Sequence, residues 1–194
     1  MVAKIESKII KFDKKFQHLC KRKYRGHPKG CPNYGKKPGC PPGPLLDEVF
    51  DLNKEMCVLY TEYAVGERAE IMKQNPKLKT PGQWYNSRYW QDAARSQHAK
   101  EILADAAPML NITPDRLLRL NLNIFFGLGT VKPSERKAFF NLGDLVLDKT
   151  PEARGVNVTD LMQKLGIELR WGQWPPPHSL DNTTYVVSLL GHPL

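Results

Sequence analysis

The stretch EMCVLYTEYAV, residues 55–65, carries the strongest strand pattern in the chain. Its β-branched and aromatic side chains form a short apolar run, which is typical of a buried strand. A second such run, TTYVVSLLG at 183–191, and a shorter one, IELRW at 167–171, predict two further strands near the end of the sequence. We therefore expect a sheet at the centre of the fold.

Helical patterns occur before, between and after these runs, over residues 44–52, 66–75, 81–107, 113–121 and 157–166. The longest has Thr80 as a good N-cap and Pro81 in the first helical position. Residues 3–17 could form a strand or a short helix, and residues 122–130 a strand or a buried turn.

Together these patterns predict an α/β or α+β fold, formed by a single domain over residues 1–194. We expect a small sheet of about three to five strands with helices packed on it. A loop rich in cysteine precedes the first strong strand.

That loop, CKRKYRGHPKGCPNYGKKPGCPPGP at residues 20–44, holds three of the four cysteines and six of the sixteen prolines. It has almost no apolar side chain to bury and no acidic residue. Its composition is that of a loop. Either it is a disordered basic arm, or a metal held by its cysteines takes the place of a hydrophobic core.

The charge of the chain is concentrated at the same end. The net charge is +9, and residues 1–41 alone carry twelve Lys and Arg against two acids. This excess predicts an anionic partner, namely a nucleotide, an RNA or a phosphorylated small molecule. A solvated basic arm is the alternative.

No apolar run approaches the roughly 18 residues of a membrane span, so no membrane contact is expected. The first residues also lack the apolar stretch of a secretory signal. We therefore expect a cytoplasmic protein. Because thiols stay reduced there, the cysteines are expected to be ligands or buried side chains, not disulfides.

The cysteine spacing, Cys20-x10-Cys31-x8-Cys40, lacks the C-x2–4-C knuckle of structural zinc sites. Ligands spread along a loop can reach a larger iron–sulfur cluster, with 4Fe–4S as the first choice. Zinc, with His27 among its ligands, is the alternative cofactor, and a loop without metal is the third. Cys57 could be a fourth ligand or a buried free cysteine within its strand.

Four further residues are candidates for substrate binding. His27 and Tyr34 lie in the loop, where they could contact a substrate or serve as turn and anchor residues. Arg88 and Arg95 share a face of the predicted 81–107 helix with Gln91, and could line an anion pocket or form a solvated face. No P-loop, nucleophile elbow, zinc-protease or EF-hand motif occurs.

Two segments resemble a family of small, cysteine-rich, predicted metal-binding proteins. GCPNYGKKPGCPP, residues 30–42, resembles the C-x-x-YG…CPP signature of that family. PEARGVNVTDLMQKLGIEL, residues 151–169, followed by WPPP and YVVSLLG, resembles its closing pattern. The resemblance implies a cluster bound by Cys31 and Cys40 with Cys20. Members often carry a second cysteine group before the closing pattern, but residues 123–155 contain none, so a second cluster is excluded.

These features predict an iron–sulfur protein whose cluster lies at a basic, partly exposed end. If it is an enzyme, an iron without a cysteine ligand would act on a nucleotide or RNA by sulfur transfer or removal. The alternative is a zinc-binding nucleic-acid module without catalysis. A partner-binding adaptor with a structural cluster is the third hypothesis, and the sequence leaves the oligomeric state open.

Overall fold

The computed structural model describes residues 1–23, 28–36, 39–85, 89–98, 101, 118–121, 145–169, 183–192 and 194. The fold combines helices with one sheet, which confirms the predicted mixed α+β class. No helix within these ranges is both long and apolar enough to cross a bilayer.

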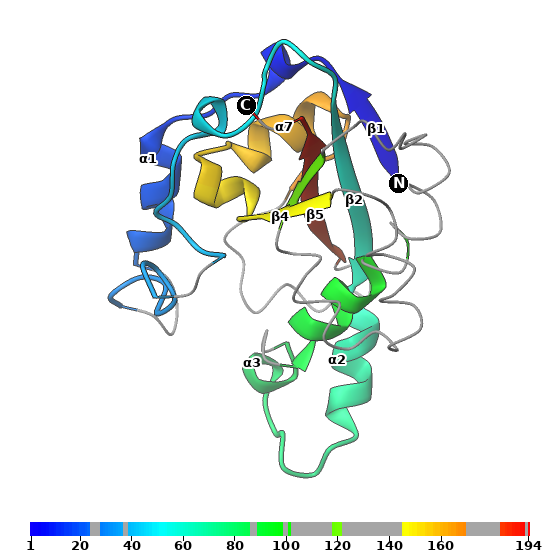
Figure 1. The fold of residues 1–194 in the computed structure, drawn as a ribbon. Coiled ribbons are helices and arrows are strands. Elements are labelled where there is room, and N and C mark those ends of the chain that lie inside the picture. Colours follow the sequence, from blue (N-terminus) through cyan, green and yellow to red (C-terminus); the bar gives the residue numbers. More distant parts are fainter. Residues whose placement is uncertain are drawn as a thin grey trace.

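Two long strands form the middle of the sheet (Figure 1). β2 (Met56–Ala64) pairs antiparallel with β5 (Thr183–Gly191) along its length, from Cys57 opposite Leu190 to Ala64 opposite Thr183. The order across the sheet is β1-β2-β5-β3-β4. The outer strands are short: β1 (Val2–Ile5), β3 (Leu118–Asn121) and β4 (Leu145–Asp148).

The main core lies between this sheet and α7 (Val158–Lys164). Asn157 caps α7, because its side chain accepts a hydrogen bond from the backbone N–H of Asp160. Leu161 and Met162 are buried against residues of β2 and β5, including Val58 and Leu189. In Figure 1 α7 lies beside the upper part of the sheet.

A second apolar cluster lies at the other end of β2. α2 (Val65–Lys73) continues directly from the strand, and α3 (Pro81–Trp84) packs beside it. Val65, Ala69 and Tyr85 are buried there, with the rings of Tyr63 and Trp90 stacked 6.5 Å apart. α2 and α3 lie below the sheet in Figure 1, opposite α7.

Short elements lead into the cysteine-rich loop. The first residues form both kinds of structure that their pattern allowed, with β1 followed by the single turn η1 (Ser7–Ile9) and by α1 (Lys14–Gln17). η2 (His18–Lys21) continues α1. Further short turns are η3 (Leu46–Glu48) and η5 (Pro151–Arg154).

The predictions of a strand at 55–65, a helix at 66–75, a helix at 157–166 and a strand at 183–191 are confirmed by β2, α2, α7 and β5. The predicted helix at 44–52 shortens to η3. These four successes share a strong local pattern bounded by clear stop residues.

The single long helix predicted at 81–107 is wrong. Thr80 caps α3 as expected, but α3 ends at Trp84, and a separate helical segment covers residues 91–98. The indole N–H of Trp90 donates to the carbonyl of Tyr85 at 3.1 Å. The Tyr85 carbonyl thus accepts a hydrogen bond from a side chain, whereas in a continuous helix it would accept one from a backbone N–H.

Two other predictions also fail. The helix expected at 113–121 is a strand over 118–121, because these residues pair with β4 and β5, and residues 113–117 lie outside the described ranges. The strand expected at 167–171 does not form over 167–169: the Ile167 N–H closes α7 on the Met162 carbonyl at 2.9 Å. Residues 122–130 lie outside the described ranges.

Candidate metal centre

The first cysteine lies on the turn that follows α1. Asp13 caps α1 by accepting a hydrogen bond from the backbone N–H of Lys15. The buried side chain of Gln17 then donates to the carbonyls of Gly43 and Ala153, at 2.7 and 2.9 Å. One amide group therefore ties the turn that carries Cys20 to the end of the cysteine-rich loop and to η5.

The second cysteine is held against the first through the backbone. The Cys31 N–H donates to the Cys20 carbonyl at 2.7 Å. Gly30 makes this contact possible, because it has a φ of 80° and a Cβ there would lie 2.7 Å from the Lys21 carbonyl carbon and oxygen. Only glycine suits both the left-handed backbone and the close approach.

The third cysteine lies on the returning limb of the loop. The Gly35 N–H donates to the Pro41 carbonyl at 2.7 Å, which closes the turn between the two limbs. The Thr150 N–H donates to the Gly39 carbonyl at 3.2 Å, which fixes the residue before Cys40 to the start of η5. In Figure 1 the loop lies at the lower left, below α1.

The loop is hydrogen-bonded to η5. Thr150 is its N-cap, Pro151 is in the first position, and Gly155 ends it with a φ of 73°. The Arg154 guanidinium donates to the Pro44 carbonyl at 3.2 Å. The loop is therefore fastened by hydrogen bonds between backbone and side chains, with little apolar packing.

The thiol of Cys20 is affected by the charges around it. The pKa of Cys20 is raised to about 11, first by burial and then by the negative charges of Cys31, Glu152 and Cys40. Glu152 is far from Cys20 in the sequence, so the fold brings its charge near the Cys20 thiol. A thiol with this pKa is protonated at neutral pH, and a bound cation is the change that would favour its thiolate.

Glu152 is the residue of this site that the sequence-based prediction missed. It lies on η5 and is partly buried. Burial raises the pKa of its carboxyl, opposed by hydrogen bonds with its own backbone N–H and the Thr150 side chain. The available signal was its place in PEARG, the start of the second segment that resembles the family.

The arrangement suits some metal groups better than others. Among the described residues, no three His, Cys, Asp or Glu side chains converge closely enough to hold a single metal ion. The charges of Cys31 and Cys40 nevertheless both reach the Cys20 thiol. A wider set of thiols is the donor chemistry of a multi-iron cluster, whereas a zinc ion requires tetrahedral contact at about 2.3 Å. By donor type, the three thiols suit an iron–sulfur cluster.

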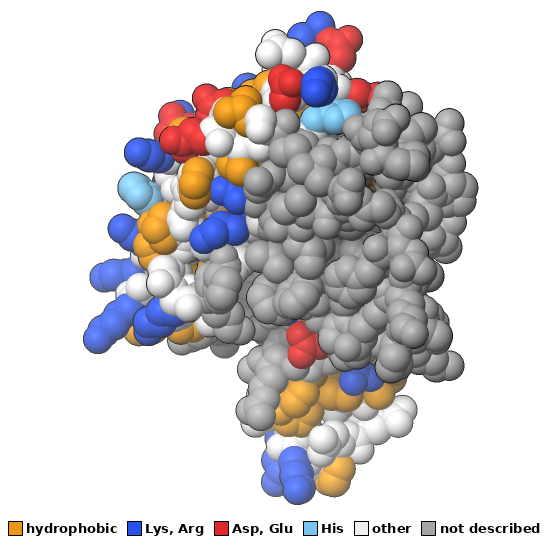
Figure 2. Space-filling model, in the orientation of Figure 1, with side chains coloured by type: hydrophobic (Ala, Val, Ile, Leu, Met, Phe, Trp, Pro, Cys, Tyr) orange, Lys and Arg blue, Asp and Glu red, His pale blue; other side chains and the backbone are white. Residues whose placement is uncertain are grey.

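The basic residues of this end do not determine the pKa of Cys20. Among the described residues, the charges that shift this pKa are all negative. The Lys and Arg side chains of this end are exposed instead, and Figure 2 shows them gathered along the left edge of the molecule, over α1 and the loop. We call these exposed residues the basic face: Lys14, Lys15, Lys21, Arg22, Lys23, Lys29 and Lys36.

Cys57 is in a different environment from the other cysteines. It is buried on β2, opposite Lys4 of β1 and Leu190 of β5. It is not among the groups that shift the pKa of Cys20. β2 also lies apart from the loop in Figure 1. The structure thus joins the backbones of Cys20 and Cys31, brings the charge of Cys40 within reach of the Cys20 thiol, and leaves Cys57 in the sheet.

The candidate substrate residues are less closely tied to this site. The Lys21 ammonium lies 4.9 Å from the centroid of the Tyr34 ring. The backbone N–H of Tyr34 donates to the Cys31 carbonyl at 3.2 Å. This geometry favours an anchor within the loop. Arg95 contacts Asp92 of its own helical segment at 3.3 Å. His27 and Arg88 lie outside the described residues.

A separate polar cluster lies between the 91–98 segment and the sheet. His98 is fully buried, with Nδ1 2.9 Å from Thr61 Oγ1 and Nε2 2.9 Å from Ser188 Oγ. Thr61 donates to Glu101 at 2.7 Å, so its hydroxyl accepts from His98 Nδ1–H. This order resembles a Ser-His-acid chain, but Ser188 has no exposed surface and no substrate can reach it. The cluster fastens the 91–98 segment to the sheet.

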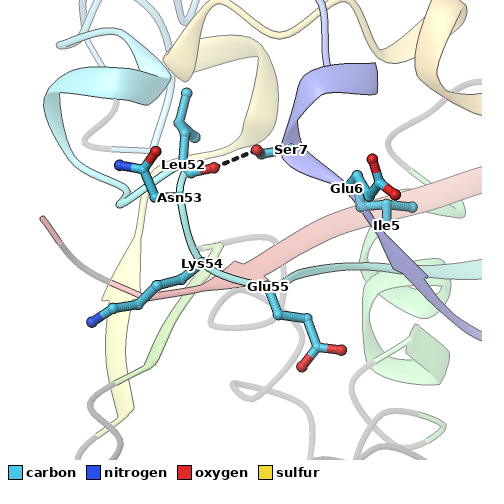
Figure 3. A pocket seen from close by; sticks show the side chains of 7 residues that line it. All are labelled: Ile5, Glu6, Ser7, Leu52, Asn53, Lys54 and Glu55. Atoms are coloured by element: carbon cyan, nitrogen blue, oxygen red, sulfur yellow. Dashed lines mark hydrogen bonds between the residues drawn. The ribbon is translucent and has the colours of Figure 1, made fainter.

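An open pocket of about 440 Å³ lies elsewhere, between the end of β1 and the turn before β2 (Figure 3). It is lined by Ile5, Glu6, Ser7, Leu52, Asn53, Lys54 and Glu55. The Ser7 hydroxyl donates to the Leu52 carbonyl across it. No cysteine lines it, so it is not part of the candidate metal centre.

Comparison with family models, curated proteins and solved structures places the site in no known group: none of the three finds a match to this chain.

Proposed function

We propose that this chain is an iron–sulfur protein whose cluster, 4Fe–4S in the first instance, is bound by Cys20, Cys31 and Cys40. The observation that carries the proposal is that the Cys31 N–H is bound to the Cys20 carbonyl at 2.7 Å, while the charges of Cys31 and Cys40 both raise the pKa of the half-buried Cys20 thiol. An iron–sulfur cluster takes cysteine thiolates as its ligands, so it would use these side chains together. The resemblance to the cysteine-rich family agrees with this site and stays a prediction.

The basic face supports an anionic partner for the cluster. Within the described part of the chain, Lys15 alone among its residues pairs with a carboxylate, that of Asp13 at 3.6 Å. The remaining positive charges are available to phosphates. We propose a nucleotide or RNA as the partner, and sulfur transfer to or removal from a base as the reaction that a substrate-accessible iron would serve.

Anaerobic purification tests the cluster. We expect broad absorbance at about 400 nm, where thiolate-to-iron charge transfer falls, with iron and sulfide in equal amounts. Colourless protein without iron after anaerobic purification and reconstitution would refute the proposal.

Single substitutions identify the ligands. Cys20→Ser, Cys31→Ser and Cys40→Ser should each lose most of the iron. Cys57→Ala is the matched control, because it removes a thiol of the same chain from a buried strand. If Cys57→Ala lost the cluster while the other three variants kept it, the proposed ligand set would be wrong.

A zinc-binding nucleic-acid module is the second candidate, and the exposed basic face is the observation that favours it. Such a protein would be colourless, would contain stoichiometric zinc, and would shift labelled RNA without acting on it. Metal analysis of the same preparation separates the two candidates, because zinc and iron are measured together.

A further inference from the structure

The backbones of Cys20 and Cys31 lie in direct contact. The Cys31 N–H donates to the Cys20 carbonyl at 2.7 Å. Standard backbone bond lengths keep two Cα atoms joined through such a hydrogen bond within about 6.6 Å of each other. The Cα atoms of a disulfide lie about 4.4–6.8 Å apart. The separation of these two cysteines therefore falls below the upper limit for a disulfide.

Local structure holds both cysteines at this separation. Cys20 is placed by η2, which continues α1. The Cys31 carbonyl accepts from the Tyr34 N–H at 3.2 Å, so both backbone polar groups of Cys31 are paired. Gly30 permits the close approach, because a Cβ at this position would lie 2.7 Å from the Lys21 carbonyl carbon. The contact is therefore built into the turn and does not depend on a bound metal.

The side chains agree with the backbone contact. After burial, the charge of Cys31 is the largest influence that raises the pKa of Cys20, ahead of the charges of Glu152 and Cys40. Both thiols are also partly exposed, so a small oxidant can reach them.

The other two cysteines are held elsewhere. The limb that carries Cys40 is bound to η5, because the Thr150 N–H donates at 3.2 Å to the carbonyl of the residue before Cys40. Cys57 lies in β2, and neither residue opposite it in the sheet is a cysteine. Cys31 is therefore the partner that the fold offers to Cys20.

We propose that Cys20 and Cys31 form a reversible disulfide when the chain holds no metal. The inference goes beyond the proposed function and does not depend on it, because the two thiols pair without iron. The oxidant is hydrogen peroxide: two S–H bonds and the O–O bond break, one S–S bond forms, and two molecules of water leave. A small-molecule dithiol reverses the step by thiol–disulfide exchange, returns a hydrogen to each sulfur and becomes a disulfide itself.

This disulfide acts as a redox switch for the loop. It occupies two of the three thiols that the proposed cluster requires, so iron cannot be bound until a reductant reopens the bond. It also protects both sulfur atoms from irreversible oxidation to sulfinic and sulfonic acids.

Oxidation of the metal-free protein tests the pairing. The full chain is stripped of metal with a chelator, treated with one equivalent of hydrogen peroxide, alkylated and digested with trypsin. Trypsin cleaves after Lys21 and after Lys29, so Cys20 and Cys31 fall in separate peptides and mass spectrometry identifies the linkage directly. We expect the peptides 16–21 and 30–36 to be linked and the number of free thiols to fall from four to two. A dithiol should restore all four.

The same oxidation in urea is the control, because pairing in an unfolded chain follows loop length. Cys31 and Cys40 enclose eight residues, whereas Cys20 and Cys31 enclose ten. The shorter loop costs slightly less entropy to close, so urea should give at least as much Cys31–Cys40 as Cys20–Cys31. A predominant Cys20–Cys31 product in the folded protein is therefore directed by the fold.

Two glycine variants test whether the backbone contact directs the pairing. Gly30→Ala places a Cβ against the Lys21 backbone and should reduce the yield of the Cys20–Cys31 disulfide. Gly82→Ala, with open space around it, should leave the yield unchanged. Equal yields in the two variants would overturn the inference, since it rests on this contact.

Three further results would also overturn it: a main product that links Cys40 to either Cys20 or Cys31, a disulfide between two chains, or four free thiols after peroxide. An anaerobic preparation without a cluster would overturn the proposed function and leave this inference standing. If Gly30→Ala does not fold, the peptides of the wild-type protein still decide.

Discussion

Acidification should destabilise this protein through His98. The imidazole is fully buried and both its nitrogens are hydrogen-bonded to hydroxyl groups. The pKa of His98 is lowered from 6.5 to about 3, first by burial and then by the charge of the N-terminal ammonium. The folded protein therefore keeps His98 neutral at a pH where the unfolded chain protonates it.

The sign and size of the change in stability follow from this difference between the folded and unfolded states. Between about pH 6.5 and about pH 3 the unfolded state binds the extra proton, so stability falls as the pH falls through this window. One pH unit corresponds to about 1.36 kcal/mol. At pH 5, about 1.5 units below the unfolded pKa, the loss is about 2 kcal/mol, and it reaches about 5 kcal/mol at the lower end of the window.

Urea unfolding at pH 8 and pH 5, followed by circular dichroism, measures the loss. His98→Gln should reduce the difference between the two pH values by about 2 kcal/mol relative to the wild type. His18→Gln is the matched control, because His18 is exposed on η2 and should leave the difference unchanged. Equal pH dependence in the wild type and His98→Gln would refute the reasoning.

A spectroscopic check does not depend on the stability of the variant. In the wild-type protein the ¹⁵N signals of His98 should show a neutral ring at pH 5 with the proton on Nδ1, because Thr61 already donates to Glu101. An imidazole that titrates near pH 6.5 would contradict its burial.

Three further perturbations test the loop and its surface. Gly30→Ala should destabilise the protein by about 1–3 kcal/mol in thermal unfolding, because the φ of Gly30 is positive and a Cβ would overlap the Lys21 backbone. Gly82→Ala is the control: this glycine lies on α3 with open space around it, so the substitution should be neutral or stabilising in the same assay. Gln17→Leu should lower the free energy of unfolding by about 1–3 kcal/mol for each of the two carbonyls that lose the Gln17 amide, and should lower iron retention. An unchanged midpoint of urea unfolding would show that these two hydrogen bonds are unimportant. Replacing Lys21, Arg22 and Lys23 by glutamine should weaken RNA binding and lower the salt slope by about 2, near 0.7 for each charge; a slope equal to that of the wild type would exclude these residues from the interface.

The strongest local patterns were sufficient to predict several elements. Residues 55–65 and 183–191 form β2 and β5 because β-branched and aromatic residues pack well on a sheet wherever it forms. α7 follows from a capping residue and a glycine stop. Weaker segments, such as 118–121, took the structure that their neighbours required, since pairing with β5 outweighs a helical preference.

The candidate site also has features that follow from the local sequence and features that depend on packing. The cysteine spacing and the scarcity of apolar residues predict a metal in the loop, and this stays a prediction. The hydrogen bonds that fasten the loop to η5 and α1 could not be predicted, because they join distant segments. The break after Trp84 could not be predicted, since it depends on the indole of Trp90 reaching the Tyr85 carbonyl.

The sequence alone determined which residues could form strands, helices and a thiol-rich loop, because these depend on neighbours a few positions away. Only the tertiary structure decided that the Gln17 side chain binds both Gly43 and Ala153, that Cys57 stays in the sheet, and that His98 is buried between two hydroxyls. Such meetings depend on how distant segments pack, and packing is a property of the whole fold.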